Sequence, residues 1–159
     1  MRMPLRFVIR PLETLPWPQG LGKHGGGYRD LESAMLELLG EDNFWSPEAH
    51  RCAFAEGDPD YRRIVLTELG KRNWSADLAD GVDRATALAR LAPLLDTSLA
   101  SESPWLDWAS RHRDDYPVWS WLANGLTVGS SAIADGRHRL TFLRYHRPPE
   151  HEVLVRVET

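Results

Sequence analysis

Cysteine is almost absent from this chain of 159 residues, which contains only Cys52. A single thiol excludes a disulfide within the chain, a CxxC redox pair and any zinc site built from several thiolates. A mixed run of histidines and glutamates at residues 146–152 does not compensate, because two prolines interrupt it and it lacks zinc-site spacing. Thiol redox chemistry and a zinc centre are therefore not expected.

Long apolar runs are also missing. No stretch approaches the roughly 18 to 20 apolar residues that cross a bilayer, and residues 1–17 lack the apolar core and cleavage site of a secretion signal. We therefore expect a cytoplasmic protein with no membrane contact. The formal net charge of −4 at pH 7 argues against a surface coated with basic residues for non-specific nucleic-acid binding.

What remains is the composition of one globular domain spanning residues 1–159. The hydrophobic fraction of 42% and the charged fraction of 26% are ordinary for a folded chain. A β-prone run at residues 5–9 predicts a first strand, and residues 29–116 carry the apolar spacing of a block of helices. Two of these helices are expected to begin at Ser-Pro steps, with Ser46 and Ser103 as capping residues.

The segment after residue 116 predicts mainly extended structure. Residues 117–123 alternate apolar with small or polar side chains before an Asn-Gly turn, so they predict a strand that pairs with residues 126–134. Residues 137–147 have helical spacing, and residues 151–159 predict a last strand. The predicted fold class is α+β, with a helical block inserted between the first strand and the later strands.

Positive charge gathers beside the Asp-Gly step at residues 135–136. Residues 136–149 contain four arginines and no acidic residue, so they carry +4 whereas the rest of the chain carries −8. The predicted strand-to-helix junction leaves free backbone N–H groups that favour an anion, and Asp135 can cap the helix while Gly136 lets a ligand approach. The first turn then carries Arg137, His138 and Arg139, which suit phosphate oxygens. The alternative is an ordinary turn with solvated arginines.

Three motifs occur in a recognisable order along the chain. They are "VIRPLETLP" near the N-terminus, "PVWSW", and "AIADGRHRL" followed by a short helix and the strand "VLVRVE". This order resembles the ParB/sulfiredoxin superfamily over residues 5–16 and 117–158, and it leaves the helical block about 29–116 unexplained. The resemblance implies a small mixed sheet and a nucleotide site. In that site Gly136, His138 and Arg139 hold the phosphates, and Arg137 adds a contact.

Two departures from the superfamily narrow the implied function. Arg137 stands where sulfiredoxins have their reactive cysteine, so reduction of sulfinic acids is not expected. The chain ends after the last strand, without the helix-turn-helix domain of centromere-binding members, so chromosome partitioning is not expected either. Single-domain members that inhibit the fertility of conjugative plasmids, with ATPase and DNase activities, are more similar. The resemblance thus implies a hydrolase that binds ATP or another nucleotide with Mg²⁺, with DNA and a conjugation or secretion-machinery protein as further partners.

Catalytic roles are expected for three residues. Asp135 or Glu13 is expected to hold Mg²⁺ or orient the attacking water, and His138 to shuttle a proton. Glu13, after the first strand, matches the catalytic base of free amino-acid kinases in the superfamily. Asp135 as a helix cap and Glu13 as a surface residue are the alternatives. Two other functions stay open: a small-molecule kinase, and a non-catalytic protein whose basic turn docks an acidic partner or a nucleic-acid backbone.

Three other features carry weaker signals. The glycine-rich segment 19–30 lacks both the P-loop ending and dinucleotide-fingerprint spacing, so a connector or lid is favoured over a ligand contact. The tryptophans of residues 105–121 favour core packing over base stacking. Residues 71–74, "KRNW", are too short to form a nucleic-acid patch.

Overall fold

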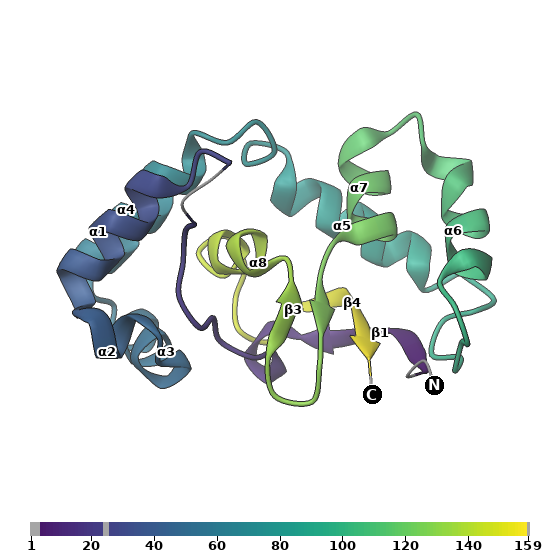
Figure 1. The fold of residues 1–159 in the computed structure, drawn as a ribbon. Coiled ribbons are helices and arrows are strands. Elements are labelled where there is room, and N and C mark those ends of the chain that lie inside the picture. The colour runs from purple at the N-terminus through teal and green to yellow at the C-terminus, as the bar shows by residue number, and fades with distance from the viewer. Residues whose placement is uncertain (1–3, 24–25, 159) are drawn as a thin grey trace.

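The computed structural model describes residues 4–23 and 26–158. Residues 24 and 25 of the glycine-rich segment and residue 159 of the last predicted strand lie outside the described residues. The described part confirms the α+β class: helices lie above a four-stranded mixed sheet and on either side of it in the view of Figure 1. No helix in these two ranges is long and apolar enough to cross a membrane.

Strands and helices follow one another in nearly the predicted order. They are β1 (Leu5–Pro11), the 3₁₀ helix η1 (Leu12–Thr14), α1 (Arg29–Leu39), α2 (Glu41–Phe44), α3 (Pro47–Ala55), α4 (Pro59–Gly70), α5 (Leu78–Ala89), α6 (Ser103–Ala109), η2 (Ser110–His112), α7 (Tyr116–Asn124), β2 (Thr127–Val128), β3 (Ile133–Asp135), α8 (Arg137–Leu143) and β4 (Glu152–Glu158).

The sheet has the strand order β1-β4-β2-β3. β1 and β4 pair antiparallel, with Val8 opposite Val155, while β2 runs parallel to β4 and antiparallel to β3. The backbone N–H of Gly129 donates to the carbonyl of Ala132 at 2.8 Å and closes the β2–β3 hairpin. Because β2 and β4 are parallel, the chain must cross over between them, and α8 lies in that connection.

The predicted strand at residues 117–123 is wrong, because these residues belong to α7. Pro117 lies in the first turn of this helix, where its fixed φ favours helical geometry. Val118, Trp121 and Leu122 are buried, and their spacing of three and four residues is the helical period. The strand pair is instead the β2–β3 hairpin, which the second predicted strand, 126–134, forms together with Asp135.

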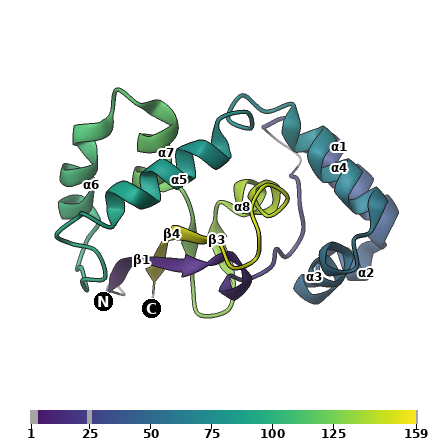
Figure 2. The same cartoon turned by 180° about the vertical axis from the view of Figure 1, so that it is seen from behind.

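The predicted helical block is confirmed as α1 to α6, arranged in groups around the sheet. α1 to α4 gather on one side of the molecule and α6 and α7 on the other, and α5 crosses between these groups (Figure 2). Ser46 caps α3, since its hydroxyl accepts the backbone N–H of Ala49 at 3.2 Å. The predicted cap at Ser103 is wrong, because α6 already includes this residue and no side chain caps the helix.

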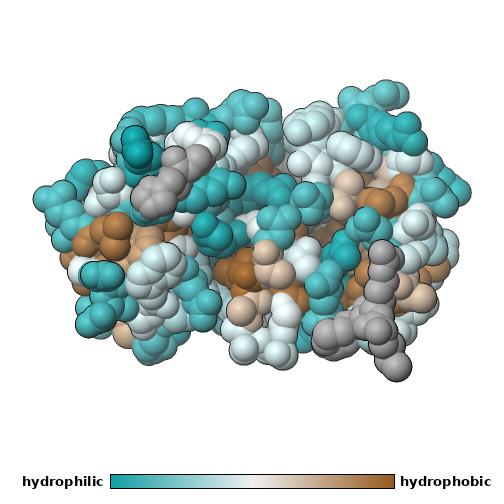
Figure 3. Space-filling model, in the orientation of Figure 1, coloured by the Kyte–Doolittle hydropathy of each residue, from teal (hydrophilic) through white to brown (hydrophobic). Residues whose placement is uncertain are grey.

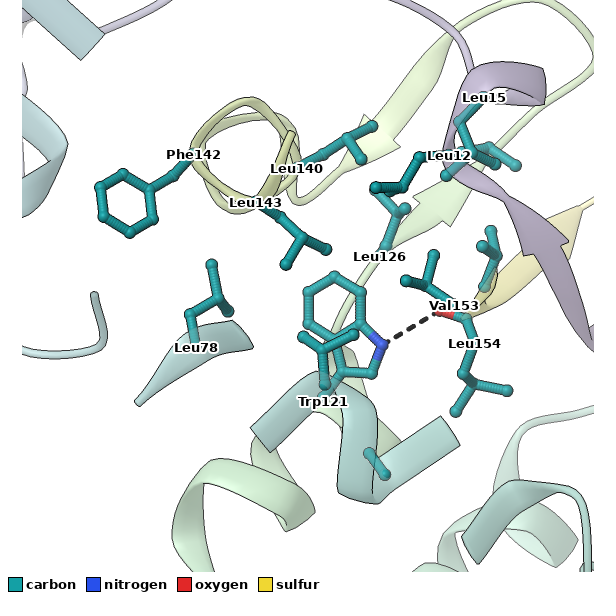
Figure 4. Close-up of a cluster of buried hydrophobic side chains, with 14 of the residues drawn as sticks. Leu12, Leu15, Leu78, Trp121, Leu126, Leu140, Phe142, Leu143, Val153 and Leu154 are labelled. Carbon is teal, nitrogen blue, oxygen red and sulfur yellow. Dashed lines mark hydrogen bonds between the residues drawn. The ribbon is translucent and has the colours of Figure 1, made fainter. Parts of the chain in front are cut away.

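The core joins α7, α8 and the sheet. Leu140 and Leu143 of α8 are fully buried among apolar side chains (Figure 4). Trp121 of α7 donates its indole N–H to the carbonyl of Leu154 in β4 at 3.0 Å, and the Thr86 hydroxyl of α5 accepts the Leu154 backbone N–H at 3.0 Å. Two helices therefore hold the same β4 residue, which fixes the sheet beneath the strand-to-helix junction.

Hydrophobic residues also reach the surface. On the face drawn in Figure 3 they form several separate patches between hydrophilic residues. This face therefore presents no single continuous apolar surface.

Candidate functional site

The predicted phosphate turn lines a surface pocket of about 210 Å³, which we call the turn pocket. Three segments far apart in the sequence build it: the glycine-rich segment, the α4–α5 connection and the run from β3 into α8. Its lining residues are Lys23, Tyr28, Trp74, Ile133, Ala134, Asp135, Gly136, Arg137, His138 and Arg139. All the predicted site residues except Glu13 therefore meet here.

Gly136 sets the direction in which the chain enters α8. Its φ of +91° lies in the left-handed region, which glycine adopts without steric cost. A Cβ at this position would lie 2.5 Å from the carbonyl oxygen of Gly125, just before β2. The glycine is thus required by the close packing of this turn against the chain, a requirement separate from the predicted approach of a ligand.

Asp135 ends β3 and is exposed in the wall of the turn pocket. Its predicted capping role is wrong, because Gly136 is the N-cap residue of α8 and no side chain caps that helix. Among the described residues, no group of three or more histidine, cysteine or acidic side chains is placed to hold a metal ion. A metal ion here would therefore depend on Asp135 together with oxygens of a bound ligand, a combination typical of Mg²⁺.

Gly22 of the glycine-rich segment is held from both sides by the first turn of α8. Its N–H donates to Nε2 of His138 at 2.8 Å, and its carbonyl accepts a hydrogen bond from Nη2 of Arg137 at 2.9 Å. Its φ is +92°, and a Cβ there would lie 2.5 Å from the backbone nitrogen of Glu32. The segment is therefore fixed at this point and forms a wall of the turn pocket.

Stacked side chains extend this wall. The Tyr28 ring lies 4.2 Å from the His138 ring at an interplanar angle of 11°, and the Arg72 guanidinium covers the Tyr28 ring at 4.4 Å. Arg72 also donates to the carbonyls of Gly27 at 3.2 Å and Gly26 at 3.0 Å. The α4–α5 connection thus clamps the described end of the glycine-rich segment onto α8.

Positive charge surrounds His138 in the turn pocket, and it contributes to the lowered pKa of this side chain. Burial, and to a smaller extent the positive charges of Arg137, Lys23 and Arg72, lower the pKa of His138 to about 3. The ring is therefore neutral near pH 7, and since Nε2 accepts a hydrogen bond, the proton resides on Nδ1. This geometry favours a role for His138 in holding Gly22 over the predicted proton shuttle.

Arg139 lies at the edge of the turn pocket. Its Nη2 donates to the carbonyl of Asn124, and its guanidinium lies 5.6 Å from the Trp121 ring. Burial lowers its pKa, while the charge of Asp135 opposes that shift. Arg139 is thus a half-buried cation with donors left for a ligand.

The other two arginines of the predicted basic cluster do not reach this pocket. Arg144 is buried, covers the Trp17 ring at 3.6 Å and donates to the carbonyl of Leu15 at 2.9 Å. Arg147 pairs with Asp83 of α5 at 2.7 Å. Only Arg137 and Arg139 of the four therefore supply charge to the turn pocket.

Glu13 lies in a different hollow. It lines a space of about 440 Å³ together with Trp17, Phe54 and Arg144, and it does not line the turn pocket. The structure thus does not bring Glu13 together with Asp135. The two predicted catalytic carboxylates do not form one site.

A second hollow of about 490 Å³ adjoins the turn pocket, and we call it the aromatic groove. It shares Trp74 and Arg139 with the turn pocket and is further lined by Tyr116 and Trp119. The expectation of core packing holds for Trp105, whose buried indole N–H donates to the carbonyl of Leu122 at 2.9 Å. Trp74 and Trp119 are only partly buried.

Three site residues escaped the sequence-based prediction. Lys23 and Tyr28 flank the glycine run that was interpreted as a connector, and Trp74 belongs to the short "KRNW" segment. The available signal was a lysine and an aromatic residue beside glycines. Local pattern does not indicate that these residues meet a turn more than 60 positions away.

Comparisons with family models, with curated proteins and with solved structures found no match for this chain. The resemblance to the ParB/sulfiredoxin superfamily therefore stays a prediction, and the geometry of the two hollows carries the functional argument.

Proposed function

We propose that this chain is a nucleotide phosphohydrolase that holds the phosphates of ATP, or of a related nucleotide, in the turn pocket. The supporting observation is the convergence of Lys23, Arg137 and Arg139 on one small pocket. Together with burial, two of these cations and Arg72 keep His138 neutral. An anion of several charges is the ligand that relieves such crowding of positive charge.

The proposed reaction is attack of water on the terminal phosphorus. The bond from phosphorus to the bridging oxygen breaks, and a nucleoside diphosphate and inorganic phosphate leave. Lys23 and the two arginines neutralise charge on the phosphoryl oxygens, which is the main catalytic demand of phosphoryl transfer. Asp135 would hold Mg²⁺, which would neutralise further charge on the phosphates.

The resemblance to the ParB/sulfiredoxin superfamily supports this proposal in part. The strand, the Asp-Gly-x-His-Arg turn and the helix follow one another in the expected order. The Pro-Val segment departs from the pattern because it is helical in α7. DNA cleavage, a role in plasmid fertility inhibition and a partner in conjugation stay predictions, and incubation of supercoiled plasmid with the protein and Mg²⁺ tests the first.

Lys23 provides the cleanest test, because it is exposed and its replacement disturbs no described hydrogen bond. We expect Lys23→Gln to weaken ATP binding about tenfold in calorimetry, the effect of losing one charge-assisted hydrogen bond. Lys71→Gln is the matched control: it removes the chain's other lysine, which lies outside the pocket and pairs with Glu68 at 3.0 Å. Equal affinity for the two variants would contradict the proposed phosphate site.

Hydrolysis needs a separate measurement. Phosphate release from ATP should require Mg²⁺, and Asp135→Asn should abolish it while Mg²⁺-free nucleotide binding persists. Tight ATP binding with no phosphate release by the unmodified protein would refute the phosphohydrolase and leave a nucleotide-binding protein. Transfer of the phosphoryl group to an amino-acid hydroxyl in place of water would identify the kinase alternative.

A further inference from the structure

The aromatic groove and the turn pocket form neighbouring parts of one concave surface. They share the side chains of Trp74 and Arg139, so a ligand that crosses this boundary contacts both. Their volumes are about 210 and 490 Å³. Together they reach the size range of pockets that bind ligands as large as a nucleotide.

The two parts differ in charge. The turn pocket contains Lys23 and Arg137 in addition to the shared Arg139, and these three cations outnumber its one carboxylate, Asp135. Beyond the shared arginine, the aromatic groove contains only one charged residue, Asp77, which is exposed near the start of α5. Electrostatics therefore directs the anionic end of a ligand to the turn pocket and an uncharged end to the aromatic groove.

Trp119 offers the aromatic groove a ring surface for stacking. The ring is partly exposed, its described ring contact is a tilted one with Tyr116 at 6.3 Å, and its indole N–H donates to no described residue. Trp74, at the boundary, meets Phe142 edge to face at 5.7 Å. By contrast, Trp121 donates its N–H to β4, so its role is structural.

The aromatic groove also contains a hydrogen-bond acceptor, the carboxylate of Asp77. The Asp77 carboxylate lines the groove, caps no helix and bonds to no other described residue. A carboxylate accepts hydrogen bonds from an exocyclic amino group and has no donor for a carbonyl oxygen. Planar surface, an acceptor and a neighbouring cation pocket are the features that recognise a nucleobase attached to phosphates.

We propose that the aromatic groove binds the base of the nucleotide whose phosphates occupy the turn pocket, with Trp119 stacking on the base and Asp77 accepting from its amino group. This inference rests on the proposed nucleotide site and adds a base specificity to it: adenine is favoured over uracil, which has no amino group. The α4–α5 connection, which supplies Trp74 and Asp77, and α7, which supplies Trp119, are then the parts of the chain that select the nucleotide.

Calorimetry with three probes tests this inference: ATP, UTP and inorganic triphosphate, each with Mg²⁺. The unmodified protein should bind ATP about 5- to 100-fold more tightly than inorganic triphosphate, the range expected for stacking of one base. Trp119→Ala should remove most of that advantage and leave the affinity for inorganic triphosphate unchanged, and Trp119→Phe should retain part of it. Trp45→Ala is the matched control, since Trp45 is 58% exposed and lies outside the groove.

The outcomes separate the two proposals. If inorganic triphosphate binds as tightly as ATP, the base subsite is refuted while the phosphate site stands, and this comparison needs no variant to fold. If no probe binds, both are refuted. Equal affinities for ATP and UTP, or an ATP preference that survives Asp77→Ala, would overturn the assignment of the amino group to Asp77.

Discussion

Replacing Gly136 with alanine tests how the strand-to-helix turn is built. Gly136 has a φ of +91°, and a Cβ added there would lie 2.5 Å from the Gly125 carbonyl oxygen and 3.2 Å from the Cα of Leu126. Both neighbours are backbone atoms, so no side-chain rotation relieves the contact. Either β2 and its approach must move away from α8, or the turn must change its φ.

The cost has two components. Holding alanine in the left-handed region costs about 1 to 2 kcal/mol. Overpacking against rigid backbone adds typically about 1 to 3 kcal/mol. Gly57→Ala isolates the first component, because Gly57 has a φ of +68° but a Cβ there would meet no atom within 4 Å. We therefore expect Gly136→Ala to lower the free energy of unfolding by about 1 to 3 kcal/mol more than Gly57→Ala does.

Urea unfolding followed by tryptophan fluorescence and circular dichroism measures both free energies, with the slope against urea as a check that the unfolding transition is unchanged. Gly136→Ala should also weaken nucleotide binding, since Arg137 and His138 follow this turn directly. Equal destabilisation by the two variants would show that the turn relaxes freely, and would refute the view that its packing against β2 fixes the site.

Two further predictions concern titration and a buried hydrogen bond. The pKa of His138 is about 3 in the folded chain, and its ordinary value is 6.5. Between these two pH values the unfolded chain therefore binds one proton more than the folded chain does. The stability that the neutral ring confers should be complete above pH 6.5 and decline as the pH falls toward 3, at up to about 1.4 kcal/mol per pH unit. His138→Gln should flatten that part of the stability profile in urea unfolding from pH 4 to 7, and an unchanged slope would contradict the buried, neutral ring. Thr86→Val should lower the free energy of unfolding by about 1 to 3 kcal/mol, because the buried N–H of Leu154 loses its acceptor. Thr67→Val is the control, since Thr67 is exposed. Equal thermal melting temperatures for the two variants would refute this role of the Thr86 hydroxyl.

The sequence pattern was sufficient to predict a helix or strand where the apolar residues follow one period over several turns or residue pairs. The helical block, β1 and β4 were predicted because apolar spacing over several residues reports the face that is buried. The failure at residues 117–123 has a local cause: Trp119 and Trp121 fit an alternating pattern, yet the buried set of 118, 121 and 122 is helical. Only packing against α5 and the sheet distinguishes the two patterns over so short a run.

The residues of the candidate site also fall into two groups, those that the sequence places together and those that only the fold brings to them. The sequence alone determined that Asp135, Gly136, Arg137, His138 and Arg139 lie together, because they are consecutive at a strand-to-helix turn. Only the tertiary structure decided which distant groups join them. Lys23 and Trp74 reach the turn pocket because the glycine-rich segment and the α4–α5 connection converge there on the run from β3 into α8.

The same physical reason separates the remaining residues from the site. Arg144 is seven residues beyond Arg137, which places it about 10 Å farther along the helix direction, where it is buried against Trp17. Glu13 follows β1, the edge strand opposite β3, and lines another hollow. Local sequence sets charge and backbone preference, whereas the order of strands in the sheet sets which charges share a pocket.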